Sequence, residues 1–237
     1  MKTYKIHLIR HGLTQANIKG LYVGSTDTPL APQGIKELNE LKNKFNYPNA
    51  GLLYVSPMKR CVQTADILYP DMKKQVVENL KECDFGDWEN KNAKDLEKDK
   101  EFLTWLSSGQ VSSACTAENL TDFTRRVCSC FEDIIDKIIK SEMKDAIVVT
   151  HGGVIMTLLA SFGIPKAKAF QWGSNNGCGY SIRITPSLWV RDHVFEVYDK
   201  VPESIYEVDR NEANELSDVM KDVTSTIKNL DKYKQNA

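Results

Sequence analysis

The sequence predicts an α/β fold, a three-layer α/β/α sandwich with a mostly parallel central sheet, plus a C-terminal helical extension. Three short apolar segments indicate this fold, because each is followed at once by a polar junction and then by a helical pattern. The junctions lie at residues 10–12, 56–57 and 151–152. Strands that alternate with helices are typical of an open parallel sheet with helices on both faces. Functional side chains of such sheets gather beyond the carboxyl ends of the strands, so we expect these junctions to lie close together.

The first half of the chain shows apolar runs of strand length and apolar residues at helical spacing. Ser56 and Pro57 resemble a helix start, with serine at the N-cap and proline in the first turn. In order, the pattern predicts a strand at 4–9, a polar loop at 15–28, a helix at 33–45, a strand at 52–55, a helix from 56 to 68 and a strand at 75–82.

The second half contains the clearest amphipathic pattern of the chain, at residues 118–141. The pattern predicts helices at 92–107, 118–141 and 154–162, strands at 147–150, 178–184 and 189–198, and a polar helical tail at 203–235. We therefore expect one domain at residues 1–200 and a helical extension at 201–237 that packs on it.

Composition narrows the classes of function. The 237 residues carry a formal net charge of −1, so no global basic field favours nucleic acid. No apolar run has the roughly 20 residues that a membrane span needs, and the first residues lack a signal-peptide pattern. Neither the cysteines nor the histidines have zinc-binding spacing. We expect a cytoplasmic protein, monomeric or homodimeric, with reduced cysteines and no metal or cofactor, nucleic-acid partner or membrane partner.

The first junction carries Arg10, His11 and Gly12 directly after a buried strand. Phosphoryl transfer through histidine needs an imidazole with one unprotonated nitrogen, donors for the phosphoryl oxygens, and an acid for the leaving oxygen. His11 fits the nucleophile, Gly12 leaves room beside the backbone, and Arg10 offers a planar fork for phosphate. The alternative for His11 is a structural histidine in the core, and the alternative for Arg10 is a surface ion pair.

The other two junctions each contribute a candidate donor. Arg60 falls in the first turn of its helix, where the helix dipole disfavours a cation, and this local cost hints at function. His151 precedes Gly152 and Gly153 between a strand and a helix, where an imidazole and free backbone N–H groups suit phosphate. A histidine at the N-cap is the plainer interpretation.

A proton donor is expected in the acidic segment that follows the strand at 75–82. Glu82 is the first candidate, because partly apolar surroundings raise the pKa of a carboxyl and keep it protonated. Asp84, Asp87 and Glu89 compete with it, and spacing does not choose among the four.

Five motifs in the same order resemble the histidine phosphatase superfamily, the phosphoglycerate mutase-like proteins. The resemblance covers about residues 4–184. Its motifs are RHGxTxxN at residues 10–17, a G…D.PL…G stretch at 24–34, SPxxRxxQTA at 56–65, LxE..FGxWEG at 80–90, and a second histidine motif at 150–153. Asn90 stands where many relatives have the last glycine of the fourth motif. One such motif alone is a weak signal, whereas five in family order make chance a poor explanation.

The resemblance implies roles for individual residues. It implies that His11 becomes the phosphohistidine and that Glu82 is the proton donor, which settles the choice left open by spacing. It further implies a metal-free phosphate pocket formed by Arg10, Asn17, Arg60, His151 and Gly152. Residues 117–119, Ala-Glu-Asn, depart from the family's Gly-Gly-Glu-Ser, so the substrate does not carry over directly.

The short Phe-Gly-Asp-Trp segment after Glu82 resembles the compact phosphatases of the family, including the α-ribazole phosphatase branch. Mutases of the family carry a longer insertion there. We therefore expect a phosphomonoester hydrolase for a small phosphorylated metabolite, with α-ribazole phosphate as one candidate. The alternatives are a cofactor-dependent phosphoglycerate mutase and an inactive relative that binds a phosphorylated ligand.

Overall fold

The computed structural model describes residues 2–112 and 115–203, which belong to one compact unit. The predicted helical extension at 201–237 lies almost entirely outside the described residues. Its helical structure and its packing on the domain therefore stay predictions.

A seven-stranded sheet forms the centre of this unit, with the order β3-β2-β4-β1-β6-β7-β5. The strands are β1 (Tyr4–Arg10), β2 (Leu52–Val55), β3 (Lys74–Val76), β4 (Asp145–Thr150), β5 (Gly163–Ile164), β6 (Gly179–Ile184) and β7 (Phe195–Val201). β6 runs antiparallel to both β1 and β7, and the other neighbouring strands pair in parallel. The predicted mostly parallel sheet is thus confirmed, with β1 in its middle.

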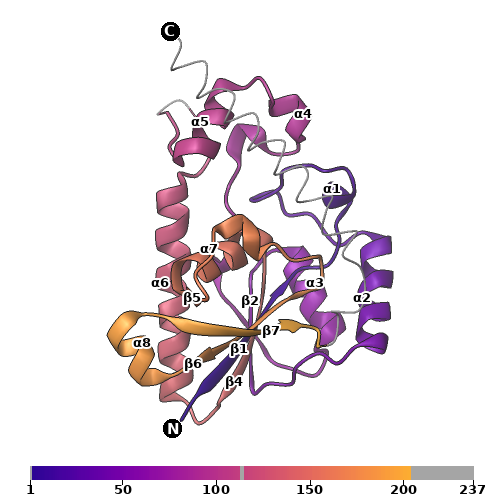
Figure 1. The fold of residues 1–237 in the computed structure, drawn as a ribbon. Helices are drawn as coiled ribbons and strands as arrows, with labels where there is room; N and C mark the ends of the chain where they lie inside the picture. Colours follow the sequence, from indigo (N-terminus) through magenta and orange to yellow (C-terminus); the bar gives the residue numbers. More distant parts are fainter. Residues whose placement is uncertain (1, 113–114, 204–237) are drawn as a thin grey trace. The chain divides into compact units, whose positions relative to one another are not determined.

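Helices cover both faces of the sheet, as the predicted three-layer sandwich requires (Figure 1). Alternate strand residues point to opposite faces. Leu8 and Val148 lie in the apolar cluster that contains α6 (Leu120–Lys140) and α7 (Gly152–Phe162). Ile9 and Val149 lie in the cluster with α2 (Pro32–Lys44) and α3 (Lys59–Leu68). β1 and β4 are therefore buried on both faces, which explains their continuous apolar runs.

Shorter elements connect these layers. They are α1 (Gln15–Ile18), η1 (Glu78–Leu80), η2 (Gly86–Trp88), α4 (Ala93–Leu96), α5 (Lys100–Ser108), η3 (Ala169–Trp172) and α8 (Pro186–Asp192), where η marks a 3-10 helix. The predicted loop at 15–28 thus contains a short helix. Thr14 and Asn17 cap it reciprocally, each side chain bonding to the other's backbone N–H.

Three predicted elements are wrong in extent or type. The strand predicted at 75–82 ends at Val76 and gives way to η1. The helix predicted at 92–107 is two helices, because Asn92 and Asp99 each cap a new N-terminus. The strand predicted at 189–198 begins as α8, whose first residue is Pro186, and becomes β7 only at Phe195.

The helix start predicted at Ser56 and Pro57 is also wrong, although the helix does end at Leu68. α3 begins at Lys59, and Met58 occupies its N-cap without a side-chain bond. Ser56 Oγ lies instead 2.8 Å from His151 Nε2. The Ser56 hydroxyl, which the local sequence predicts as a helix cap, therefore makes a tertiary contact with His151 instead.

His7 makes the stability of the fold depend on pH. It is buried in β1, with Nδ1 2.8 Å from Ser181 Oγ. Burial lowers the pKa of His7 to about 4, although Asp145 and Asp199 raise it. The unfolded chain gains a proton here below about pH 6.5, whereas the folded chain stays neutral. We expect the free energy of unfolding to fall by about 2 kcal/mol from His7 between pH 6.5 and 5.

Urea unfolding at about pH 7 and about pH 5 measures this effect. His7→Gln should lose less stability on acidification than the wild-type protein does. Asn39→Ala is the control, because Asn39 is exposed on α2 and its side chain does not titrate, so this variant should keep the wild-type pH dependence. Equal acid sensitivity in His7→Gln and the wild type would contradict the assignment.

Candidate active site

The three predicted junctions meet at one edge of the sheet. His11 follows β1, Arg60 lies in the first turn of α3 behind β2, and His151 follows β4. The rings of His11 and His151 pack edge to face with centroids 5.3 Å apart. Arg60 Nε donates to His151 Nδ1 at 3.3 Å. Residues far apart in sequence therefore form one buried, cationic site.

His11 is arranged as a neutral imidazole. Its ring Nδ1 lies 2.7 Å from the carbonyl oxygen of Gly12, an acceptor only, so Nδ1 carries the proton. Nε2 then keeps its lone pair. Burial, with the charges of Arg10 and Arg60, holds the pKa of His11 well below its usual range. The ring is therefore ready to attack an electrophile without first losing a proton.

Arg10 combines a firm anchor with an unused donor. Its Nη1 donates to Ser174 O at 2.6 Å, while its Nε is buried and has no hydrogen-bond partner within the described residues. A Cβ added to Gly152 would lie 3.4 Å from that Nε. Leaving a buried N–H unpaired costs about 1–3 kcal/mol. An anion bound between Arg10 and the start of α7 would pair this N–H, so the structure favours anion binding there.

Arg60 is almost fully buried and is held by a loop. Its Nη1 and Nη2 donate to the carbonyl oxygens of Thr26 (2.9 Å) and Gly24 (2.8 Å). The carboxylate of Glu89 fastens the same loop by accepting the backbone N–H groups of Gly24, Ser25 and Thr26. These contacts offset the unfavourable position of Arg60 at a helix N-terminus.

His151 has protein partners on both ring nitrogens. Nδ1 accepts from Arg60, so the neutral ring carries its proton on Nε2 and donates to Ser56 Oγ. Burial and the charge of Arg60 lower the pKa of His151 well below its usual range. His151 occupies the N-cap position of α7 but makes no side-chain capping bond. Donation from Nε2 to a phosphoryl oxygen would require that oxygen to replace Ser56.

The structure distinguishes the four acidic residues that spacing left open. Glu82 Oε2 accepts the Gly153 N–H at 2.9 Å, beside the first turn of α7. Burial raises the pKa of Glu82, against the effect of the Gly153 bond and the two site arginines. Asp84 and Glu89 are engaged with the loop at residues 24–26, and Asp87 is exposed. The contact with α7 therefore favours Glu82 among the four, and its raised pKa is consistent with a proton donor.

Asn17 and Gly152 lie at the rim of the same site. Asn17 Oδ1 accepts from Thr14, and the Asn176 amide lies 3.4 Å from it while donating to His11 O at 3.0 Å. Only the amide nitrogen of Asn17 is therefore suited to a phosphate. Gly152 is the first residue of α7, where a backbone N–H has no partner inside the helix.

Sequence reasoning missed several residues that hold this site together. Thr64 Oγ1 accepts the Gly12 N–H at 2.9 Å and donates to Arg60 O at 2.6 Å, so it joins the His11 loop to α3. Thr64 and Ser56 both belong to the motif at residues 56–65. That motif was the sequence feature from which their supporting contacts could have been predicted. The segment with Ser174 and Asn176 carried no comparable pattern.

Residues 2–112 and 115–203 contain no group of three or more His, Cys, Asp or Glu side chains placed to hold a metal ion. In the same part of the chain, none of the helices is both long and apolar enough to cross a membrane.

Comparison with known proteins identifies similar phosphatases and a matching family model. The model of the histidine phosphatase superfamily (branch 1) matches residues 6–196. The adenosylcobalamin/α-ribazole phosphatase of Escherichia coli K12 is 31% identical over 186 residues, covering 76% of this chain and 90% of that protein. The putative phosphoserine phosphatase 2 of Hydrogenobacter thermophilus is 32% identical over 167 residues, covering 68% of this chain and 80% of that protein.

A solved structure with a similar fold supports the sequence matches. The crystal structure of a putative α-ribazole-5′-P phosphatase from Escherichia coli superposes with a TM-score of 0.68 and 28% identity, covering 82% of this chain and 94% of that chain.

Proposed function

The chain belongs to the histidine phosphatase superfamily and is a phosphatase of a small phosphorylated metabolite, and we propose that it works through a phosphohistidine on His11. The observation that carries this proposal is the neutral His11 ring, with its Nδ1 proton held by Gly12 O and two arginines beside it. A basic nitrogen within a cationic pocket favours attack on a phosphate monoester.

In the first step, Nε2 of His11 attacks phosphorus while the bond from phosphorus to the ester oxygen breaks. Glu82 gives its proton to that leaving oxygen. Arg10, Arg60 and the Gly152 N–H stabilise the charge on the non-bridging oxygens, with Asn17 and His151 as further donors.

In the second step, the Glu82 carboxylate takes a proton from water, and the oxygen of that water attacks the phosphorus. The bond between phosphorus and Nε2 breaks, which releases phosphate and restores neutral His11. Glu82 regains its proton in the same step, so the cycle closes without another reagent. The raised pKa of Glu82 suits both roles, since the group must exchange a proton near neutral pH.

We propose α-ribazole 5′-phosphate as the first substrate to test, because a 31% identical relative is named an adenosylcobalamin/α-ribazole phosphatase and a 28% identical solved structure a putative α-ribazole-5′-P phosphatase. Phosphoserine is the second candidate, because a 32% identical relative carries that name. The proposed site of action is the cytoplasm, as a monomer or homodimer. All six cysteines are free thiols, as is typical of a reducing compartment.

Phosphate release from a metabolite panel tests this function. The panel contains α-ribazole 5′-phosphate, phosphoserine, 3-phosphoglycerate and p-nitrophenyl phosphate, each assayed with and without EDTA. We expect release of phosphate from at least one metabolite, at a rate that EDTA does not change. Conversion of 3-phosphoglycerate to its isomer with a bisphosphorylated primer would indicate a mutase instead. Binding without any turnover would indicate an inactive relative.

A further inference from the structure

The segment that carries Glu82 has no regular secondary structure of its own. η1 ends at Leu80, and η2 begins at Gly86. A side chain that must deliver a proton to one atom needs a fixed backbone. The contacts of residues 79–84 therefore decide how well Glu82 is placed.

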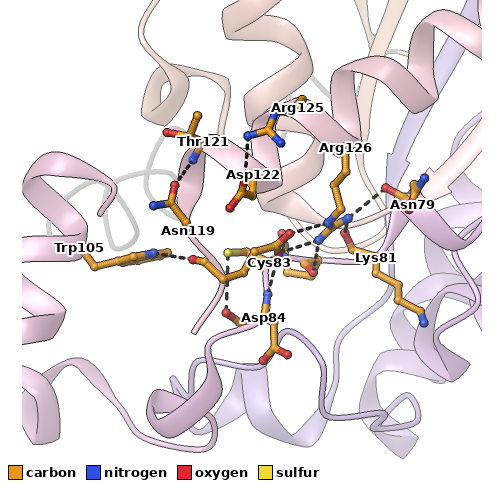
Figure 2. Close-up of polar contacts among 12 residues, drawn as sticks. Asn79, Lys81, Cys83, Asp84, Trp105, Asn119, Thr121, Asp122, Arg125 and Arg126 are labelled. Carbon is orange, nitrogen blue, oxygen red and sulfur yellow. Dashed lines mark hydrogen bonds and ion pairs between the residues drawn. The ribbon is translucent and has the colours of Figure 1, made fainter. Parts of the chain in front are cut away.

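Arg126, on α6, holds this segment by its carbonyl oxygens (Figure 2). Its Nη1 donates to Asn79 O at 3.0 Å and to Lys81 O at 2.9 Å, and its Nη2 donates to Glu82 O at 2.9 Å. Its Nε and Nη2 also donate to the two carboxylate oxygens of Glu118, at 2.7 and 2.9 Å. All five N–H groups of the guanidinium are thus in use.

Glu118 completes the grip from the other side of the segment. Its Oε2 accepts the Asp84 N–H at 3.2 Å, and its own N–H donates to Asp84 O at 2.8 Å. Its carbonyl accepts the indole N–H of the buried Trp105 at 3.0 Å. The Arg126 guanidinium also lies 4.9 Å from the ring centroid of the buried Phe123. The pair is therefore anchored in the core as well as to the segment.

We propose that Arg126 and Glu118 are positioning residues that hold Glu82 where its proton reaches the leaving oxygen. This inference rests on the role given to Glu82 in the proposed function. The main chain of Glu82 is fixed by Arg126, and its carboxylate by the Gly153 N–H on α7. Both α6 and α7 thus determine where the acid lies relative to His11.

The geometry explains why this position needs arginine. The guanidinium fork bonds both oxygens of Glu118 and still has donors for three separate carbonyl groups, whereas lysine has three donors on a single atom. Side-chain exposure is 23% for Arg126 and 17% for Glu118, so water competes little for these bonds. Loss of either partner leaves the other charge half-buried and frees the segment.

A purely structural role, which fastens α6 to the domain, predicts a different kinetic result. Loss of stability lowers the amount of active enzyme and affects every substrate equally. Displacement of the acid slows the hydrolysis of an ester more strongly when its leaving oxygen needs a proton to depart. Phenyl phosphate and p-nitrophenyl phosphate have similar shapes, but phenolate is the stronger base and the poorer leaving group. The ratio of their kcat/KM values therefore reports the acid alone.

The experiment measures this ratio for the full-length wild type, Arg126→Met, Arg126→Lys and Glu118→Gln. Since a misplaced catalytic group loses about 10²-fold, we expect Arg126→Met to lower kcat/KM for phenyl phosphate by roughly 10–100-fold. The loss for p-nitrophenyl phosphate should stay within about threefold, because p-nitrophenolate needs little proton transfer. Arg126→Lys and Glu118→Gln should shift the ratio in the same direction by less.

Arg125→Met is the matched control, because Arg125 is the exposed neighbour on the same helix and pairs with Asp122 (Figure 2). It should leave the ratio unchanged. Equal losses on both substrates, or no loss, in the Arg126 and Glu118 variants would overturn the inference. If Arg126→Met does not fold, the two milder variants decide the question. A wild-type protein that releases phosphate from neither ester and from no metabolite of the panel would refute the proposed function itself.

Discussion

Replacing His11 with alanine should lower kcat/KM for p-nitrophenyl phosphate by about 10⁴-fold or more, because a covalent mechanism cannot proceed without its nucleophile. The substitution removes the neutral ring but leaves Arg10 and Arg60 in place. Phosphate binding should therefore survive while turnover does not. Isothermal titration calorimetry with inorganic phosphate measures the binding without any need for turnover, and initial rates measure the turnover.

A second readout detects the covalent intermediate directly. Phosphate bound to a histidine nitrogen survives alkali and is lost in acid, unlike a phosphoserine ester. Wild-type enzyme quenched in alkali during turnover should carry this label, and His11→Ala should not. His193→Gln is the control, because His193 lies exposed directly after α8, and this variant should keep both activity and label. Undiminished turnover in His11→Ala would exclude His11 as the nucleophile.

The layers of this fold were predictable wherever burial sets the residue pattern. β1 and β4 are buried on both faces, and α6 has one continuous apolar stripe, so the period of apolar residues marks each of them. The same rule fails near Trp189, whose burial on α8 resembles that of a strand residue. A short apolar run does not distinguish a strand from a single helical turn, and Pro186 was the signal that favoured a helix.

The candidate site was predictable in its residue types and only partly in its contacts. The alternation of strands and helices predicted that His11, Arg60 and His151 lie beyond the carboxyl ends of strands. Functional side chains of parallel sheets gather at those ends, so the three residues were expected to lie close together. The choice of Glu82 over Asp84 depends on the bond to the Gly153 N–H, which no local pattern encodes. The support given by Ser174 and Asn176 arises from a loop whose place is set by tertiary structure.

Glu82→Gln should lower kcat/KM for phenyl phosphate by about 10²–10⁴-fold, the usual contribution of a general acid. Glutamine keeps the shape of the side chain and an acceptor oxygen for the Gly153 N–H, so the fold should be preserved. The loss for p-nitrophenyl phosphate should be much smaller, because that leaving group departs without a proton. Asp87→Asn is the matched control, since Asp87 is an exposed carboxylate of the same segment. Equal losses on the two esters would contradict the role of Glu82 as acid.

The pH profile of Glu82→Gln separates the acid from the nucleophile. Burial raises the pKa of Glu82, whereas burial and the site arginines lower the pKa of His11. The reactive form has His11 neutral and Glu82 protonated, so it exists at pH values above the pKa of His11 and below that of Glu82. Activity of the wild type should therefore extend below pH 6.5, the ordinary pKa of histidine.

The alkaline fall of kcat/KM in the wild type should follow the loss of the Glu82 proton. Glutamine does not titrate, so the variant should lose this alkaline limb and keep the acidic one. Ionisation of the substrate is identical in both enzymes, and the difference between their profiles isolates the Glu82 carboxyl. An unchanged alkaline limb in Glu82→Gln would assign that ionisation to another group, since a carboxyl that has been removed cannot control the rate.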